Sequence, residues 1–289
     1  MAAWLEDDVE VNGLRLHYTR TGGDKPTVVL THGVTDDGRC WSAIAEPLSE
    51  DYDLIMSDAR GHGRSDAPEQ GYSSDLQAAD LAALIRALGL TRPAVLGHSM
   101  GAATALVMAG TEPDVPGAII LEDPPSWWLP RDDGDAADQR RVGMGKWFMA
   151  VKRQSRDELI AAIRRDQPGW SETEQETWAD AKVRFSPYVL DLLRPNGISS
   201  IDWTATLRRI TCPTTLIYAD PERGGIVSAE AAEALRALIP HVKTEYIAGA
   251  GHNIRRDQPE RFLQVVRAAL AEWAAGRSDH RATVIEPAR

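Results

Sequence analysis

The feature of this sequence that most constrains its fold is a repeated alternation of short runs of strand length with amphipathic helical stretches. The six runs of strand length are residues 27–30, 54–56, 94–96, 118–121, 215–218 and 243–247. Helices are expected between and after them, at residues 74–88, 100–109, 228–238 and 259–275. Strands that are buried on both faces and separated by helices are typical of a doubly wound, mostly parallel sheet. The alternation predicts an α/β fold whose ligands bind beyond the carboxyl ends of the strands.

The alternation is interrupted in the middle of the chain. Residues 124–195 are polar and helix-forming, and they hold five of the nine tryptophans. We expect this stretch to be a helical cap over the sheet. The core then consists of residues 1–123 and 196–276, and residues 277–289 form a flexible polar tail.

Composition excludes several classes of function. The 289-residue chain has 43 acidic and 32 basic residues and a formal net charge of −11, so it repels phosphate backbones and anionic lipid. No run approaches the roughly 18 apolar residues of a membrane helix, and the first residues lack the pattern of a signal peptide. The two cysteines, Cys40 and Cys212, stand far apart and have no metal-ligand spacing. We expect a cytoplasmic protein with no nucleic acid or membrane partner, no metal and no cofactor.

A serine lies between two glycines in the stretch LGHSMGA, which follows one of the expected strands. Gly97 and Gly101 flank Ser99, and an apolar helical stretch follows. Small residues on both sides of a hydroxyl indicate a backbone too crowded for larger side chains. The pattern G-x-S-x-G predicts a sharp strand-to-helix turn that exposes the Ser99 oxygen.

Four motifs in the right order, THGVTDDGRCW, SDARGHGRSD, GHSMGA and GAGHNI, resemble those of the α/β-hydrolase family over roughly residues 9–275. The resemblance implies a nucleophilic Ser99 and a general base, His252, whose unperturbed pKa near 6.5 suits proton transfer. It also implies an oxyanion hole formed by the backbone N–H groups of Val34 and Met100. Arg60, in the second motif, is expected to be structural and to pair with a nearby acid.

The acid that orients His252 is left open among three carboxylates. Asp220 lies nearest to the end of the strand at 215–218 and is preferred. Glu222 fits the family's usual spacing, although Gly224-Gly225 looks like an insertion that disturbs the count. Glu122 follows the preceding strand, where some family branches, including haloalkane dehalogenases, take their acid.

A serine nucleophile suits acyl transfer, so the expected activity is hydrolysis of a carboxylic ester or lactone of a small hydrophobic molecule. His98, Trp127 and Trp128 are the candidates for the substrate pocket. Alternatives are cleavage of a carbon–carbon bond or of an amide or peptide bond by the same machinery, and a non-catalytic small-molecule receptor. The protein is expected to be a monomer or a homodimer.

Overall fold

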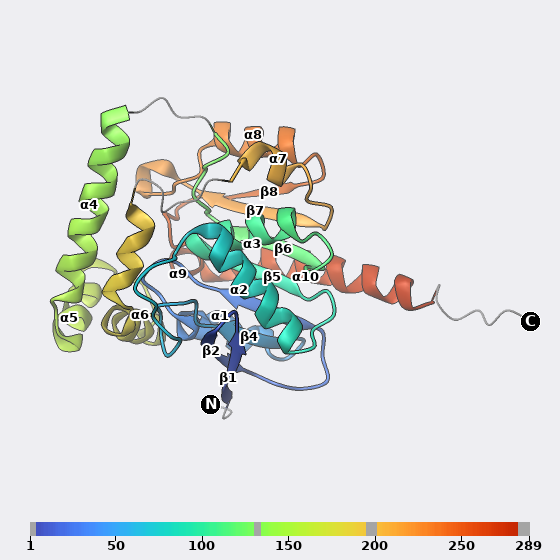
Figure 1. Ribbon diagram of the computed structural model, residues 1–289, viewed down its shortest axis with the longest axis horizontal. Helices are drawn as coiled ribbons and strands as arrows, with labels where there is room; N and C mark the ends of the chain where they lie inside the picture. Colours follow the sequence, from blue (N-terminus) through green and yellow to red (C-terminus); the bar gives the residue numbers. More distant parts are fainter. Residues whose placement is uncertain (1–3, 130–133, 195–200, 283–289) are drawn as a thin grey trace, which may run out of the picture.

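An eight-stranded sheet forms the centre of the molecule in the computed structural model, which describes residues 4–129, 134–194 and 201–282 (Figure 1). The strand order is β1-β2-β4-β3-β5-β6-β7-β8. The pairs β1–β2 and β2–β4 are antiparallel, and every pair from β4 to β8 is parallel. The strands are β1 (Leu5–Val11), β2 (Leu14–Arg20), β3 (Thr27–Thr31), β4 (Asp53–Ser57), β5 (Ala94–His98), β6 (Ala118–Glu122), β7 (Thr214–Ala219) and β8 (Lys243–Ile247).

The parallel part of the sheet confirms the six strands predicted from the sequence. Every residue of β4, β5 and β6 is buried, as expected for strands covered on both faces. Strand β5 is central and pairs with β3 on one side and β6 on the other. The residue that follows β5, Ser99, therefore leaves the sheet at its middle.

The β1–β2 hairpin was not predicted, although the sequence carries a signal for it. Its turn is Asn12-Gly13, with φ angles of 51° and 76°. An Asn-Gly pair with two positive φ angles is the commonest two-residue hairpin connection, because its twist matches that of the strands.

Helices cover both faces of the sheet. On one face, α2, α3 and α8 bury their apolar sides against Val29, Ile55 and Val95. On the other face, α1, α9 and α10 pack against Leu30, Leu54 and Leu96. The helices of these layers are α1 (Ser42–Leu48), α2 (Ser74–Ala87), α3 (Met100–Thr111), α7 (Trp203–Leu207), α8 (Ala229–Leu238), α9 (Ile254–Asp257) and α10 (Pro259–Ala282), with the 3-10 helices η1 (Gly38–Trp41) and η3 (Pro221–Arg223).

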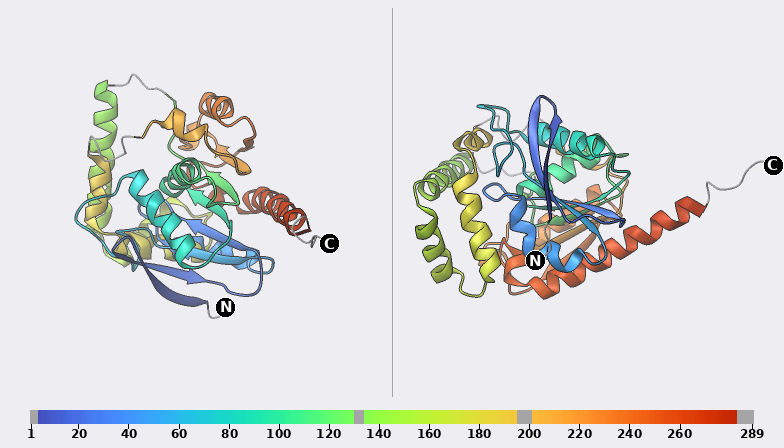
Figure 2. Two further views of the ribbon diagram at one scale, coloured as in Figure 1. Left: turned by 45° about the vertical axis from the view of Figure 1, so that its right-hand side comes forward. Right: turned by 90° about the horizontal axis from the view of Figure 1, so that it is seen from below.

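Helix α10 is longer than the sequence predicts. It continues to Ala282, and its last turns extend away from the body of the protein (Figures 1 and 2). Residues 277–282 are therefore helical, residues 283–289 lie outside the described residues, and the flexibility of the tail stays a prediction. Gly276 does not end the helix, because a glycine inside a helix costs only ~1 kcal/mol relative to alanine.

Residues 134–194, called here the helical segment, form a separate group of helices on one side of the sheet (Figure 1). They are α4 (Gly134–Lys152), α5 (Arg156–Asp166), α6 (Glu172–Arg184) and the 3-10 helix η2 (Pro187–Leu193). Their apolar side chains make a small core of their own, which Tyr72 completes from the loop before α2. The predicted cap boundaries stay a prediction, because residues 130–133 and 195–200 lie outside the described residues.

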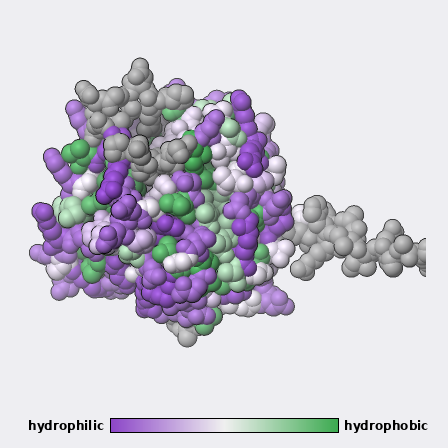
Figure 3. Space-filling view, in the orientation of Figure 1, coloured by the Kyte–Doolittle hydropathy of each residue, from purple (hydrophilic) through white to green (hydrophobic). Residues whose placement is uncertain are grey.

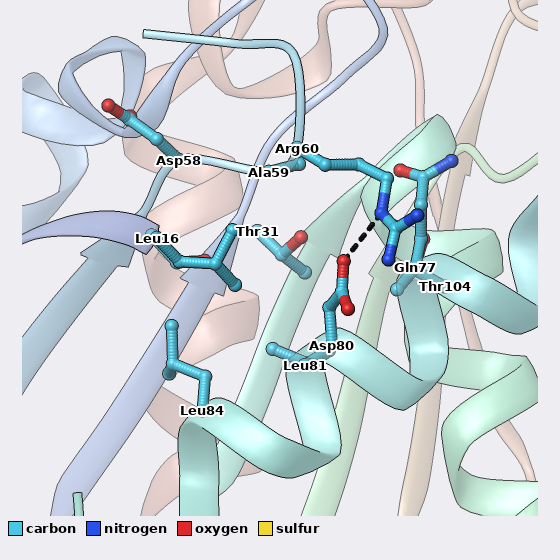
Figure 4. Close-up of a pocket in the computed structure, with 11 residues that line it drawn as sticks. Leu16, Thr31, Asp58, Ala59, Arg60, Gln77, Asp80, Leu81, Leu84 and Thr104 are labelled. Atoms are coloured by element: carbon cyan, nitrogen blue, oxygen red, sulfur yellow. Dashed lines mark hydrogen bonds and ion pairs between the residues drawn. The ribbon is translucent and has the colours of Figure 1, made fainter. Parts of the chain in front are cut away.

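Arg60 is buried and pairs with Asp80 of α2, at 2.6 Å between Nε and Oδ2, which is the structural role expected for it. The pair borders a cavity of only about 20 Å³ between α2 and the strands β2, β3 and β4 (Figure 4). On the face shown in Figure 3, hydrophilic side chains predominate and apolar ones are interspersed among them. Within the described ranges, the structure contains no helix that is both long enough and apolar enough to span a membrane.

Candidate active site

Ser99 lies at the sharp turn between β5 and α3. Its φ and ψ angles are 52° and −114°, a conformation that a residue with a side chain adopts only when its surroundings enforce it. A Cβ on Gly97 would come within 2.6 Å of the carbonyl oxygen of Gly101, and one on Gly101 within 2.3 Å of the carbonyl oxygen of Thr31. Both glycines are therefore required by close backbone approach at the turn, as the sequence motif suggests.

His252 follows β8 and pairs with a carboxylate that the sequence analysis did not consider. Its Nδ1 lies 2.7 Å from Oδ2 of Asp123, the first residue after β6. With Nδ1–H donating to the carboxylate, Nε2 is the ring nitrogen that remains free to accept a proton.

Asp123 is held rigidly. It is fully buried, and its φ of 44° places the backbone in the left-handed region. Its two carboxylate oxygens accept hydrogen bonds from the backbone amides of Ile226 and Val227, at 2.9 and 3.0 Å. These two hydrogen bonds fix the position of the carboxylate, which can then hold the imidazole in one orientation.

The structure corrects the sequence-based choice of acid, because Asp220 and Glu222 have other surroundings. Asp220 accepts hydrogen bonds from the hydroxyl of Tyr246 and from the amide of Gly249, and the former contributes most to lowering the pKa of Asp220. Glu222 is exposed on η3. Asp220 thus closes the loop after β8 rather than contacting the imidazole.

Glu122, the third candidate, is the last residue of β6 and the neighbour of Asp123. Its carboxylate binds Arg255, at 2.8 Å to the backbone amide and 3.0 Å to Nη1. Burial raises the pKa of Glu122, while the Arg255 charge and hydrogen bonds lower it. Glu122 is therefore the partner of Arg255, and Asp123 is the partner of His252.

The loop after β3 and the start of α3 contribute the two backbone amides expected to form an oxyanion hole. Met100 is the first residue of α3, where amide hydrogens have no acceptor within the helix. The carbonyl oxygen of Gly33 accepts hydrogen bonds from the Asp36 amide at 3.0 Å and from Nδ1 of His32 at 2.8 Å. In a trans peptide the next N–H points the opposite way, so these bonds fix the direction of the Val34 N–H.

A cavity of about 1000 Å³ lies between these loops and the helical segment. Ser99, His252, Val34 and Met100 all border it. Much of the remaining lining is aromatic and comes from the helical segment and the loops that face it: Tyr72, Trp127, Trp147, Phe148, Trp170 and Trp178. The described groups of His, Cys, Asp and Glu include no cluster of three or more that could hold a metal ion.

Of the residues expected to form the pocket, His98 and Trp127 border the cavity and Trp128 does not. The indole N–H of Trp128 donates to the carbonyl of Ala231 at 2.8 Å, and the ring is buried in the core beneath α8. His98 is buried, and its Nε2 lies 2.9 Å from the carbonyl oxygen of His252. Burial keeps the pKa of His98 well below its usual value, so this ring is neutral and holds the backbone of His252.

A cluster of buried charges joins the helical segment to the loops of the site. Lys182 of α6 binds Asp36 at 2.7 Å, and Glu174 of the same helix binds Arg256 at 2.7 Å. Asp36 also accepts from Arg255 and Arg256, at 2.9 and 3.0 Å. The sequence analysis missed this cluster, because its members are far apart in the chain and each alone looks like an ordinary surface charge.

A doubly wound sheet with a serine at the turn after its central strand, followed in the chain by an acid and a histidine that pair in space, defines a hydrolase of the α/β class. The chain belongs to the alpha/beta hydrolase fold family, because residues 26–255 match the sequence model of that family. The family expected from the sequence motifs is thereby confirmed.

Three related proteins are similar to this chain along most of their length. The chain is 28% identical over 272 residues to the N-formylmaleamate deformylase of Pseudomonas putida, covering 89% of this chain and 92% of that protein. It is 26% identical over 275 residues to the 2-(acetamidomethylene)succinate hydrolase of Mesorhizobium japonicum, again covering 89% and 92%. It is 29% identical over 279 residues to the lipase LipV of Mycobacterium tuberculosis, covering 88% and 97%.

Solved structures show the same fold. That of E-2-(acetamidomethylene)succinate hydrolase superimposes with a TM-score of 0.79 at 22% identity, covering 93% of this chain and all of that one. The N-formylmaleamic acid deformylase of Pseudomonas putida S16 gives a TM-score of 0.74 at 26% identity, covering 91% of this chain and all of that one.

Proposed function

We propose that this hydrolase is a serine enzyme that cleaves a carboxylic ester or lactone of a hydrophobic small molecule through an acyl-enzyme. Ser99 is the nucleophile, His252 the general base and Asp123 the acid that orients it. The observation that carries the proposal is the 2.7 Å contact between His252 Nδ1 and the buried Asp123 carboxylate, at the border of the cavity that Ser99 also lines.

In the proposed reaction, Nε2 of His252 takes the Ser99 proton as Oγ attacks the substrate carbonyl. The negative charge that develops on the carbonyl oxygen is bound by the N–H groups of Val34 and Met100. The imidazolium gives its proton to the leaving alkoxide, and the alcohol departs. Water then attacks the acyl-enzyme with the same base, which releases the acid and restores Ser99.

The lining of the cavity supports a hydrophobic substrate. Aromatic and aliphatic side chains form much of its walls, and two of the cations that border it, Lys182 and Arg256, are each paired with a buried carboxylate. Paired cations offer little to an additional anion, because their charge is already neutralised. We propose that the helical segment closes over this cavity as a cap.

Amide cleavage is the second candidate, and the names of two relatives favour it. A deformylase of N-formylmaleamate and a hydrolase of (acetamidomethylene)succinate both carry an N-acyl group in the name of the substrate. The same residues would serve, with His252 protonating a departing amine instead of an alkoxide.

A fluorophosphonate probe tests the nucleophile. It should label the wild-type protein on Ser99, as read by peptide mass spectrometry, and should not label Ser99→Ala. Ser126→Ala is a matched control, because Ser126 borders the same cavity and donates to the carbonyl of Ile226. If the wild type is neither labelled nor able to cleave any short p-nitrophenyl ester, lactone or p-nitroanilide, the proposed function is wrong. Rates on matched esters and anilides decide between the two candidates.

A further inference from the structure

Lys182 of the helical segment borders the cavity and contacts the loop after β3. It lies on α6, its side chain is 2% exposed, and its ammonium donates to two groups of the loop after β3. These are the carbonyl oxygen of Thr35 at 3.1 Å and Oδ1 of Asp36 at 2.7 Å. A buried lysine must be paired, and here both partners belong to the loop that carries Val34.

Asp36 is the centre of the interaction. Its second carboxylate oxygen accepts from Arg255 and Arg256, at 2.9 and 3.0 Å, and both arginines follow His252 on α9. Burial raises the pKa of Asp36, but the charges of Arg256, Lys182 and Arg255 outweigh burial and hold that pKa well below its usual range. Asp36 is therefore a permanent anion that holds together α6, α9 and its own loop.

The backbone of Asp36 connects this ionic contact to the reacting atoms. Its amide donates to the carbonyl of Gly33 at 3.0 Å, and that carbonyl belongs to the peptide whose N–H is the Val34 donor. A shift of Asp36 would weaken one of the two hydrogen bonds that hold this peptide, the other being that from His32. The strength of an oxyanion hydrogen bond depends on its donor being aimed in advance, so a small rotation weakens the stabilisation of the transition state.

From this chain of contacts we infer that Lys182 is a positioning residue for the oxyanion hole. It holds the Asp36 loop so that the Val34 N–H points at the developing oxyanion. A residue of the helical segment thus affects kcat through the orientation of this backbone donor. This inference rests on the proposed function, in which Val34 is one of the two donors.

Lys182→Met is the variant that tests the inference, because methionine fills much of the lysine volume without its charge. Asp36 keeps both arginines as partners. Removal of one oxyanion donor lowers kcat by ~10²–10³-fold. In Lys182→Met the Val34 N–H is still present but less well oriented, so we expect part of this factor to be lost, about 10–100-fold in kcat. The KM for a short p-nitrophenyl ester should change little, since the Lys182 ammonium is already bound to Thr35 and Asp36 of the loop.

A transition-state analogue separates positioning from a general structural effect. The Ser99 hydroxyl adds to the carbonyl carbon of an alkyl trifluoromethyl ketone, and the adduct carries a negatively charged oxygen. The matching trifluoromethyl alcohol has no carbonyl group and forms no such adduct. We expect Lys182→Met to weaken inhibition by the trifluoromethyl ketone by about the factor lost in kcat/KM, and to leave inhibition by the alcohol within about twofold.

Arg156→Met is the matched control. It removes another pair made by α6, the exposed Arg156–Asp180 pair at 2.5 Å, away from the loop after β3. Its kcat and its ketone affinity should equal those of the wild type. Lys182→Gln, which keeps a donor for the Thr35 carbonyl, serves if Lys182→Met does not fold, and it should show the same split between kcat and KM.

The outcomes are distinct. An active wild type with unchanged kcat and unchanged ketone affinity in a folded Lys182 variant overturns this inference and leaves the proposed function intact. Equal losses of ketone and alcohol binding also overturn it, because they indicate a collapsed pocket. A wild type that neither turns over esters nor binds the ketone overturns the proposed function itself.

Discussion

Glu122 and Asp123 are adjacent in the chain, both are fully buried, and they serve different partners. Glu122 binds the guanidinium and the backbone amide of Arg255, and Asp123 binds the imidazole of His252. Because both partners lie on the stretch after β8, this pair of acids fixes the histidine loop at two points three residues apart. One carboxylate anchors the loop and the other orients its imidazole.

The first prediction concerns this division of roles. Asp123→Asn should lower kcat by several orders of magnitude, of the ~10⁴-fold size seen when a triad aspartate loses its charge, because the imidazole adopts the wrong tautomer. Steady-state kinetics on a short ester measure it.

Asp220→Asn and Glu122→Gln are the comparison variants for that prediction. Asp220→Asn should keep kcat within a few fold, since Asp220 contacts Tyr246 and Gly249. Glu122→Gln should chiefly lower stability, because it leaves the buried charge of Arg255 with one partner fewer. If Asp220→Asn were inactive and Asp123→Asn active, the assignment of the acid would be wrong.

Substitutions of the neighbouring residues Trp127 and Trp128 should affect different properties, substrate preference for Trp127 and stability for Trp128. Trp127 borders the cavity and stacks near Trp203, at 5.2 Å between ring centroids, so Trp127→Ala should change the preference among esters of graded acyl length with little effect on the shortest. Trp128→Phe should leave that preference unchanged and cost about 0.5–1.5 kcal/mol of stability, because it removes the hydrogen bond from the buried indole N–H to the carbonyl of Ala231. Kinetics across the ester series and urea unfolding separate the two effects.

Glycine substitutions test the crowding at the nucleophile turn. Gly101→Ala places a Cβ 2.3 Å from the carbonyl oxygen of Thr31, so we expect severe destabilisation or loss of soluble protein. Gly143→Ala is the control, since a Cβ at this position in α4 meets no atom within 4 Å. It should raise stability by roughly 0.5–1 kcal/mol, as is usual for a helical glycine replaced by alanine. A Gly101→Ala protein with wild-type melting temperature would contradict the tight turn.

Buried histidines make stability depend on pH. Burial is the largest cause that lowers the pKa of His32 and of His62 to about 4, from 6.5. Between these values the unfolded chain binds protons that the folded protein refuses, so stability is complete above about pH 6.5 and is lost as the pH falls towards 4. Each histidine contributes on the order of 3 kcal/mol to this loss.

Asp58 acts against this trend, because burial raises its pKa to about 6 and so favours the folded state as the pH falls below that value. Urea unfolding of the wild type and of His32→Asn between pH 7 and 4.5 isolates the histidine effect. The variant should lose less stability than the wild type over this range. Identical pH profiles would show that His32 is not held neutral.

Much of the fold was accessible from the sequence. The runs that became β3 to β7 could be recognised because strands inside a parallel sheet are buried on both faces, whereas β8 is an edge strand of which only Ile247 is buried. The hairpin of β1 and β2 was missed, although its Asn12-Gly13 turn is visible in the sequence. The end of α10 was misplaced, because a glycine near a helix end is a weak signal when the helix continues past it.

What the sequence by itself determined is the family, the parallel part of the sheet, and the turn that carries Ser99, because these depend on local patterns: apolar periodicity and glycines beside a serine. Only the tertiary structure decided which acid faces His252, which tryptophan borders the cavity, and that Lys182 reaches Asp36. Each of these depends on the direction in which a side chain leaves the backbone and on residues more than 100 positions away, as in the contacts of Asp123 with His252 and of Asp36 with Lys182. Local sequence does not specify such long-range partners, and two adjacent residues at the end of β6, Glu122 and Asp123, bind different residues of the stretch after β8.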